Sequence, residues 1–472
     1  MWNYLNLAVL ILLASAAAAV LGPWIFLAIL AAGVFWFLVE IPLIGIIALL
    51  LGIIAGQIIR LPIGGGTIVA SDLILFAVIF AWIFKKLIKR EPFFISNPIN
   101  LPLIILDVIM ALSLVWALVI LPRGEAVSGS LYFFRFLAYQ MIFFLAQTSI
   151  KSITRAKQIF FLVLGSGIIL SILGFIQLII FPDFSSMVPE GWDPHIGRLL
   201  STWFDPNLLG GLFAFLALLI ITQMLFEKIK FWHIASLSIF ITALLLTFSR
   251  SSLVAFVFGF FVIIILTIKR SWWMLGLGIG ILIIAFLASP RIQERVGGIL
   301  TIDVTAQKRV ESWNNVLVLA RDNPLFGTGF NTLRYVQFEE GLITNPEEHS
   351  AGGSDSSFLT ILATTGIFGL LAFLWLWLSA LFVSWKLFKR VEFTPHETEG
   401  FRAGAEENCV NPSDYYFNSA LGLGIIGGLA SLFVHSQFVN SLLYPHVLVA
   451  VWMLLGVAAW IHNKQTQIIV KS

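Results

Sequence analysis

The stretch "LLLTFSRSSLVAFVFG", residues 244–259, governs how the chain is interpreted, because it places an arginine between two apolar runs. Serine residues flank Arg250 on both sides. An arginine at the centre of a bilayer helix costs roughly 2.5–3.5 kcal/mol on insertion scales. Arg250 therefore either ends a membrane span, with its side chain reaching the headgroups, or belongs to a functional site. The choice depends on the side of the membrane that it faces and on the residues that accompany it there.

The composition is that of a polytopic membrane protein. Of the 472 residues, 59% are hydrophobic and 11% are charged, whereas soluble domains carry about 25% charged residues. The surplus apolar surface has to face lipid. The single cysteine, Cys409, excludes an intramolecular disulfide, and the seven histidines show no spacing typical of a metal site. We therefore expect no bound metal.

Apolar segments long enough to span a bilayer occur along the whole chain. A span needs about 20 mostly apolar residues, and crowding of the first three segments leaves the expected count at about 12–14. The expected fold is therefore an all-α, polytopic membrane protein with one large outer-face loop between residues 290 and 356. The expected spans are 3–20, 22–40, 41–59, 67–84, 101–121, 131–148, 158–181, 206–226, 231–249, 252–268, 272–289, 357–385, 417–436 and 444–462.

Basic loops predict the orientation of these spans, because short loops rich in Lys and Arg stay in the cytoplasm. Such loops fall in alternate connections, and the connections between them are poor in both residues. Both termini are therefore predicted to be cytoplasmic, whereas Arg250, the loop 182–203 and the segment 290–356 face outward. We divide the chain into N-terminal spans (1–196), a core that includes the outer loop (197–385) and a C-terminal part (386–472). The basic loops are "KKLIKR" (85–90), "KSITRAK" (151–157), "EKIK" (227–230), "KR" (269–270) and "KLFKR" (386–390).

The long outer segment begins with "TIDVTAQKRVESWNNVLVLARDNPLFGTGFNT", residues 301–332. Its apolar residues recur at helical spacing, so 304–321 is predicted to be an amphipathic helix near the membrane surface. Arg309 and Trp313 are four residues apart and share one face of that helix. An ordinary interfacial helix with a snorkelling arginine explains the same pattern. The residues of the apolar face are Val310, Trp313, Leu317 and Ala320.

The segment then continues as "NPEEHSAGGSDSSFLTILATTGIFGLLAFL", residues 345–374. Asp355 stands where the long apolar helix begins, so its carboxylate either caps the helix or takes part in chemistry. His349 lies six residues earlier, where a loop histidine is either simply solvated or part of a site.

Further polar residues lie in or beside the spans. Arg198 and Asn207 flank "RLLSTWFDPN", where Asn207 either binds a ligand or bonds to a neighbouring backbone group. Arg135 and Asp107 are ionisable residues inside spans, which are functional candidates by default. A structural ion pair between Asp107 and Arg135 explains them equally well.

The outer face combines several arginines with an acidic loop. The segment 290–356 contains six Lys/Arg and nine Asp/Glu, so it does not attract polyanions in bulk. A few arginines directed at one compact anion, such as a diphosphate, fit better, because guanidinium groups match phosphate oxygens in bidentate fashion.

Three blocks in this order resemble the O-antigen ligase and O-antigen polymerase superfamily. They are "SRSSLVAFVFG", "RVESWNNVLVLARDNPLFGTGFNT" and "DSSFLTILATTGIFGLL" within 244–372, and "GRLLSTWFDPNLLGGL" extends the match upstream to about 197. Members are multi-spanning enzymes of the bacterial cytoplasmic membrane that transfer a glycan from a polyprenyl diphosphate to an acceptor hydroxyl on the outer face. They use no metal, nucleotide sugar or other cofactor. The resemblance implies that Arg250 and Arg309 hold the diphosphate.

One departure bears on the acceptor. Ligases usually carry His-Asn where this chain has Asp355 and Ser356, and some polymerases have Asp there. The resemblance therefore favours a surface-polysaccharide polymerase over a lipid A-core ligase or a protein O-oligosaccharyltransferase. Asp355 is the expected base, with Glu339, Glu340 and His349 as the next candidates. We expect Arg198, Asn207, Arg135, Trp313 and His349 to bind substrate.

A transporter or lipid-glycan flippase is the rival from another class. It would also have many spans and buried charges, but it should show broken helices around charges in the middle of the membrane. In this chain the polar residues gather in the outer loops instead.

Overall fold

The computed structural model describes residue 9 and residues 23–63, 66–268, 276, 280, 293, 304–345, 353–389 and 412–471. Most of the expected spans 3–20 and 272–289 lies outside them, and so does His349. The described elements are α2 (Pro23–Glu40), α3 (Pro42–Ala55), β1 (Arg60–Ile63), β2 (Gly66–Val69), α4 (Ala70–Lys89), α5 (Asn100–Ile120), α6 (Arg123–Ser149), α7 (Ile153–Ile180), the 3₁₀ helix η1 (Ser185–Glu190), α8 (Pro206–Phe226), α9 (Phe231–Leu246), α10 (Arg250–Leu266), α13 (Val304–Asp322), α14 (Leu333–Glu339), α15 (Ser357–Lys389), α17 (Pro412–His435) and α18 (Pro445–Lys471).

The helices confirm a polytopic membrane protein. Among the described residues, seven helices are long and apolar enough to cross a bilayer, or eight if α2 and α3, bent by 113° at their junction, form one broken span. The expected spans 231–249 and 252–268 correspond to α9 and α10, which have 16 and 17 residues and are shorter than the seven spanning helices. The antiparallel hairpin β1–β2, which pairs Arg60 with Val69, was not expected from the sequence.

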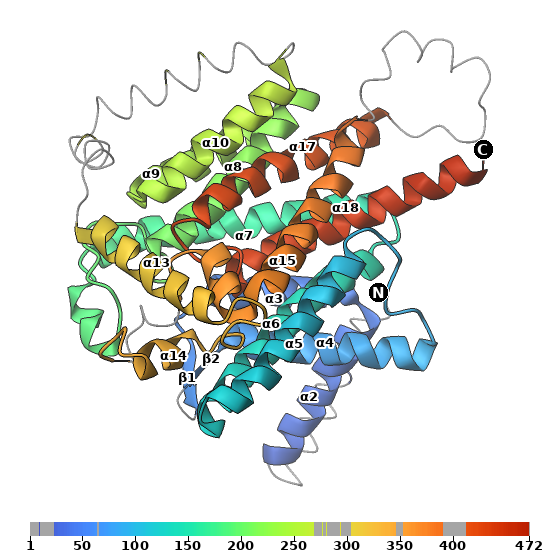
Figure 1. The fold of residues 1–472 in the computed structure, drawn as a ribbon. Helices are drawn as coiled ribbons and strands as arrows, with labels where there is room; N and C mark the ends of the chain where they lie inside the picture. The colour runs from blue at the N-terminus through green and yellow to red at the C-terminus, as the bar shows by residue number, and fades with distance from the viewer. Residues whose placement is uncertain are drawn as a thin grey trace, which may run out of the picture.

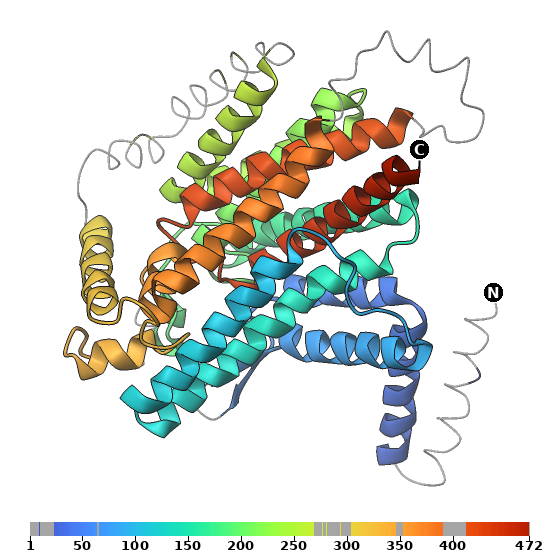
Figure 2. The same ribbon diagram turned by 45° about the vertical axis from the view of Figure 1, so that its right-hand side comes forward.

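Helix α8 forms the centre of the bundle. Its apolar residues surround the helix on every side, and 94% of its span is buried. A helix that is hydrophobic all round belongs in the interior. It packs against α9, α10 and α17, while α18 packs against α6 and α15. The central helices run side by side in both views of the ribbon (Figures 1 and 2).

The helix ends that were predicted to face outward meet at one end of the bundle. Ser252, at the start of α10, hydrogen-bonds to His435 at the end of α17. The backbone N–H of Ser357, at the start of α15, donates to the carbonyl of Ser436, and Ser71 of α4 contacts His446 of α18. Helices α13 and α14 lie at this same end, on the left of Figure 1. We call it the site end of the bundle.

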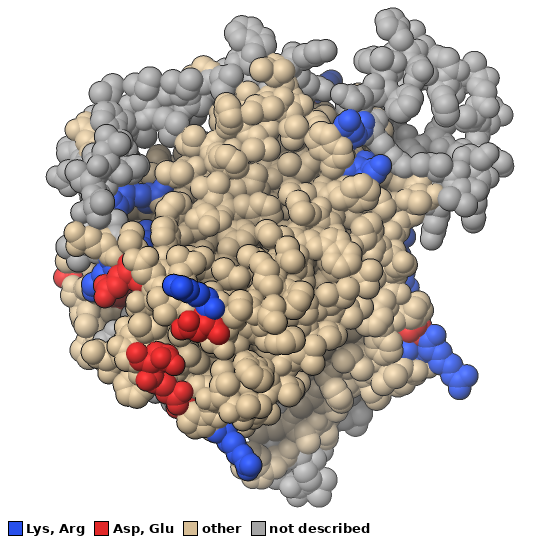
Figure 3. Space-filling model, in the orientation of Figure 1, with Lys and Arg blue, Asp and Glu red and all other residues tan. Residues whose placement is uncertain are grey.

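Helix α13 lies against α15 through a narrow apolar face. Val316, Leu319 and Ala320 are buried with Ala363 of α15 in one cluster. Leu317, on the apolar face that was predicted to lie at the membrane surface, is 46% exposed. Acidic side chains gather over the region of α13 and α14 at the lower left of Figure 3, whereas most of that face is uncharged.

Helix α15 is broken at Gly366, and the outer segment fills the break. Gly366 has φ 68°, and the N–H of Ile367 donates to the carbonyl of Pro324. The N–H of Thr328 donates to the carbonyl of Ala363, and the N–H of Gly329 donates to the carbonyl of Thr364; both carbonyls lie in the turn before the break. Irregular backbone at membrane depth is tolerated where protein satisfies its polar groups. The "NPLFGTG" turn therefore attaches the end of α13 to the middle of the long helix.

Candidate functional site

Arg309 and Asp355 come together at the site end. Arg309 lies in the second turn of α13, and Asp355 precedes the first residue of α15 by two positions. The guanidinium Nε is 3.8 Å from a carboxylate oxygen of Asp355, and the two side chains are 20% and 57% exposed. That distance is too long for a hydrogen bond. The pair is therefore an ion pair with a gap, open to solvent on the side of the carboxylate.

Two buried donors on α13 lack hydrogen-bond partners in the part of the chain that is described. They are Nε of Arg309 and the indole Nε1 of Trp313. Such atoms are nearly always bonded in native proteins, and each unsatisfied group costs about 1–3 kcal/mol. The spacing of four residues places both donors on one face of α13. An acceptor-rich ligand at this position would satisfy both.

Arg250 is the first residue of α10, and the local backbone is built to start a helix there. The hydroxyl of Ser249 accepts the N–H of Ser252, which is a standard N-cap. Phe248, just before the cap, has φ 48°. A bulky residue in the left-handed region is strained and is found where the surrounding structure enforces it.

Strained backbone is concentrated around the candidate residues. Of the six described non-glycine residues with positive φ, only Arg90 lies far from the site end. Such conformations cost on the order of 1–3 kcal/mol each and cluster at functional sites. The other five are Ser201, Phe204, Phe248, Asn331 and Asp355.

Arg198 and Asn207 are bonded to each other beside the turn that precedes α10. The Nη2 group of Arg198 donates to the side-chain oxygen of Asn207 at 3.2 Å, and its Nε donates to the carbonyl of Thr247 at 2.8 Å. Asp205 caps α8 by accepting the N–H of Asn207. These bonds hold the outer loop against the turn between α9 and α10, three residues from Arg250.

The hydroxyl of Ser356 caps α15 by accepting the backbone N–H of Leu359 at 3.4 Å. Asp355 has φ 55°, and its carboxylate faces Arg309. Its role, at the helix start or in the chemistry, stays a prediction. Glu340, an alternative base, follows the last residue of α14 and is exposed.

Arg135 pairs with a different carboxylate from the one considered in the sequence. Its Nε donates to Asp72 of α4 at 2.8 Å, and Tyr139 donates to the same carboxylate oxygen. The suggested pair with Asp107 is therefore wrong; Asp107 faces Gln140 instead. The sequence did not single out Asp72, because a residue just inside a predicted span looks like a helix cap.

Sequence reasoning also missed His435. Its side chain is fully buried, with Nε2 3.0 Å from the hydroxyl of Ser252 and Nδ1 hydrogen-bonded to Ser441. Arg309 is close enough for its charge to act on the imidazole. The available signal was a histidine opening the polar outer run "HSQFVNS", but periodicity cannot show that this run enters the site.

The segment between α17 and α18, residues 436–444, connects the parts of the site. The ring of Phe438 lies 6.1 Å from the ring of Trp313. The hydroxyl of Ser357 accepts the N–H of Leu442, and Thr360 donates to Asn440. Helices α13 and α15 therefore meet on this one segment, and α10 is connected to it through His435, which bonds both Ser252 and Ser441.

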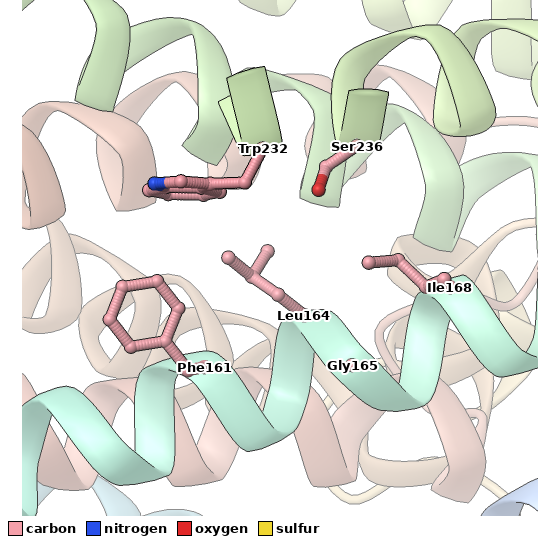
Figure 4. A pocket seen from close by; sticks show the side chains of 6 residues that line it. All are labelled: Phe161, Leu164, Gly165, Ile168, Trp232 and Ser236. Carbon is pink, nitrogen blue, oxygen red and sulfur yellow. The ribbon is translucent and has the colours of Figure 1, made fainter. Parts of the chain in front are cut away.

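An open apolar groove lies away from these residues. It has a volume of about 280 Å³ and runs between α7 and α9, as Figure 4 shows. Carbon atoms line most of it and no charged side chain reaches it, so it cannot bind a diphosphate. Trp232 is in the first turn of α9, at the opposite end of that helix from Thr247. The groove is lined by Phe161, Leu164, Gly165, Ile168, Trp232 and Ser236.

Comparison with known proteins gives one family. Residues 235–374 match the model of the O-antigen ligase family (Wzy_C). The match contains Arg250, Arg309 and Asp355, whereas Arg135 and Arg198 lie before it. No curated protein matches the chain. The chain is thus a polytopic membrane protein whose residues 235–374 form an O-antigen ligase family domain, the family of membrane glycan transfer enzymes.

Proposed function

We propose that this protein is a surface-polysaccharide polymerase. It moves a glycan from a polyprenyl diphosphate donor to a hydroxyl of a second lipid-linked glycan, on the outer face of the bacterial cytoplasmic membrane. The observation that carries the proposal is the open Arg309–Asp355 pair, with the unbonded donors of Arg309 and Trp313 beside it. The proposed core is 197–385, and the reaction needs no metal or other cofactor.

In this proposal the arginines stabilise the leaving diphosphate. As the acceptor oxygen bonds to the anomeric carbon, the bond from that carbon to the diphosphate breaks and its electron pair stays on the diphosphate. Preorganised donors stabilise the charge that develops there. Arg309 and Arg250 have this role in the proposal. Arg198, Asn207, Trp313 and His349 bind the rest of the substrate.

The acceptor needs a base. Its hydroxyl must lose a proton as it attacks, and the carboxylate of Asp355 accepts it. Before substrate binds, Asp355 faces Arg309 across 3.8 Å. A diphosphate takes that place on the guanidinium because it presents more oxygens and more charge. Donor binding therefore frees the base for the acceptor.

Asp355 also bears on the choice between polymerase and ligase. The family resemblance associates a carboxylate at this position with polymerases and His-Asn with lipid A-core ligases. Ligation to lipid A-core, or to a protein hydroxyl, uses the same donor chemistry, so these alternatives differ only in the acceptor.

One observation favours a transporter or flippase as the second candidate. Helix α15 is broken at Gly366, and broken helices are typical of transporters. However, the carbonyls beside this break are bonded by Thr328 and Gly329, so protein fills the space in which a transported ion or lipid would bind. Glycan transfer therefore remains the better supported function.

The deciding experiment supplies the purified full chain in lipid nanodiscs with a labelled polyprenyl-diphosphate-linked glycan. Parallel reactions contain no other acceptor, lipid A-core, or a serine-containing protein. We expect longer lipid-linked glycans and free polyprenyl diphosphate in the first reaction. Diphosphate release without chain growth contradicts the polymerase, and growth only on lipid A-core or protein supports the corresponding ligase. Transbilayer movement of the labelled lipid in vesicles, without transfer, supports the flippase.

A further inference from the structure

Two neighbouring glycines of α8, Gly210 and Gly211, leave room for the side chain of His435 and its partner Ser252. His435 is the last residue of α17 and packs against the second turn of α8 and the first turn of α10. A Cβ on Gly211 would lie 2.8 Å from Nδ1 of His435, and one on Gly210 would lie 2.5 Å from the hydroxyl of Ser252. No larger residue fits at either place, so the sequence "GG" of α8 admits the imidazole and its serine partner together.

Both ring nitrogens of His435 are hydrogen-bonded. The hydroxyl of Ser252 lies 3.0 Å from Nε2, 3.1 Å from the carbonyl of Asn207 and 2.9 Å from the hydroxyl of Ser249. In the neutral tautomer with its proton on Nε2, that nitrogen donates to Ser252, the hydroxyl of Ser252 donates to Asn207 or Ser249, and Nδ1 accepts from Ser441. The bonds of this tautomer run in one direction, from Ser441 through the imidazole to α10.

The two partners of His435 belong to different parts of the site. Ser252 is two residues after Arg250, in the first turn of α10. Ser441 lies in the segment 436–444, whose neighbouring residue Leu442 donates its N–H to Ser357 of α15. Ser357 follows Asp355 by two positions. His435 is therefore the side chain that joins the helix of Arg250 to the helix start beside Asp355.

We infer that His435 is a positioning residue, which sets Arg250 at a defined distance from the Arg309–Asp355 pair without touching substrate. The inference rests on the proposed function for its catalytic consequence. The structural part of the inference, that the imidazole fixes the start of α10 against α15, does not depend on the proposed function. The physical requirement is strict, because a displacement of about 1 Å in a catalytic group can reduce the rate about 10²-fold.

Two amide substitutions separate the two bonds. In His435→Gln the amide nitrogen takes the place of Nε2 and keeps the donor to Ser252. In His435→Asn the amide oxygen takes the place of Nδ1 and keeps the acceptor for Ser441. We expect His435→Asn and His435→Ala to lower kcat about 10²-fold with KM for the donor within about threefold, and His435→Gln to recover about tenfold of that loss.

The matched control is His233→Gln. His233 is also fully buried, but it bonds only the local backbone N–H of Lys230, at the start of α9. We expect its kcat to stay within about twofold of wild type. If His435→Gln and His435→Asn lose the same kcat, and these losses follow the loss of thermal stability, then His435 has only a packing role and the inference is wrong.

A distance measurement tests the inference separately from activity. The single cysteine allows spin labels at Val254→Cys on α10 and Leu371→Cys on α15 in a Cys409→Ser background, since both positions are exposed. We expect one narrow distance distribution in wild type and His435→Gln, and a shifted or broadened one in His435→Asn and His435→Ala. An unchanged distribution in His435→Ala overturns the inference. A wild-type protein without glycan transfer but with the expected distance pattern overturns the proposed function alone.

Discussion

The guanidinium of Arg309 faces the carboxylate of Asp355 across 3.8 Å, and its Nε has no hydrogen bond within the described part of the chain. A purely structural ion pair would close this gap, because a buried donor gains from every bond that it makes. The open geometry suits a pair that exchanges partners when an anion enters. It brings together two residues from separate blocks of the sequence, one on α13 and one before α15.

Replacing Arg309 should remove stabilisation of the leaving diphosphate. We expect Arg309→Ala to lower kcat for glycan transfer about 10²–10³-fold, the usual effect of losing one preorganised donor. Arg309→Lys should recover little, because an ammonium group cannot reproduce the bidentate fork. The control is Arg321→Ala, an exposed arginine in the last turn of the same helix. Wild-type rates for Arg309→Ala in the transfer assay would remove this residue from the site.

Replacing Asp355 should separate donor binding from transfer. Asp355→Asn keeps the size of the side chain but cannot accept the proton, so kcat should fall about 10²–10⁴-fold. Binding of polyprenyl diphosphate should persist or tighten, because the carboxylate no longer competes for Arg309. Calorimetry with polyprenyl diphosphate and the transfer assay together test both parts. The control is Asp322→Asn, an exposed carboxylate at the end of α13; full activity in Asp355→Asn would point to Glu339, Glu340 or His349 as the base.

Gly366 should be intolerant of any side chain. Its φ of 68° disfavours other residues, and a Cβ would lie within 2.1 Å of the carbonyl oxygen of Leu325. We expect Gly366→Ala to lower the free energy of unfolding by at least ~1–3 kcal/mol and to loosen α13 from α15. Thermal unfolding in detergent measures the change. Gly165→Ala is the matched control, because it lies within α7 with open space around its Cβ position; equal stability of the two variants would contradict the docked turn.

The buried charges should couple in a specific pattern. Arg135 bonds to Asp72, so a double-mutant cycle with Asp72→Asn and Arg135→Gln should give a coupling energy of about 0.5–3 kcal/mol. The same cycle with Asp107→Asn should give a value near zero. Unfolding free energies of the single and double variants provide both numbers. Coupling of Arg135 to Asp107 in place of Asp72 would mean that α4 and α5 are arranged differently around α6.

The sequence predicted the class of protein correctly, because hydropathy is a local property. It also predicted the helix 304–321, observed as Val304–Asp322. These features depend on residues close together in the chain. Within α13, Val316 and Leu319 are buried against the protein, whereas Val310, on the face predicted to lie at the membrane surface, is about half exposed.

Long-range pairing needed the tertiary structure. Helices such as α8 and α17 are apolar on all sides, so their periodicity does not show which residue meets which neighbour. For this reason the partner of Arg135, the break at Gly366 and the central place of His435 were not predictable. Arg309 and Asp355 were recognised as candidates from their local sequence, but nothing local could show that they face each other.

By itself, the sequence determined that the chain lies in a membrane, that its polar residues gather at one set of helix ends, and that the arginines there suit a compact anion. The tertiary structure alone decided which of these residues meet. The physical reason is that lipid solvation selects apolar segments one at a time, whereas the approach of Arg309 to Asp355 depends on how α13 and α15 are held together. In the same way, the start of α10 is bonded to His435, which packs against Gly211, 224 residues earlier in the sequence.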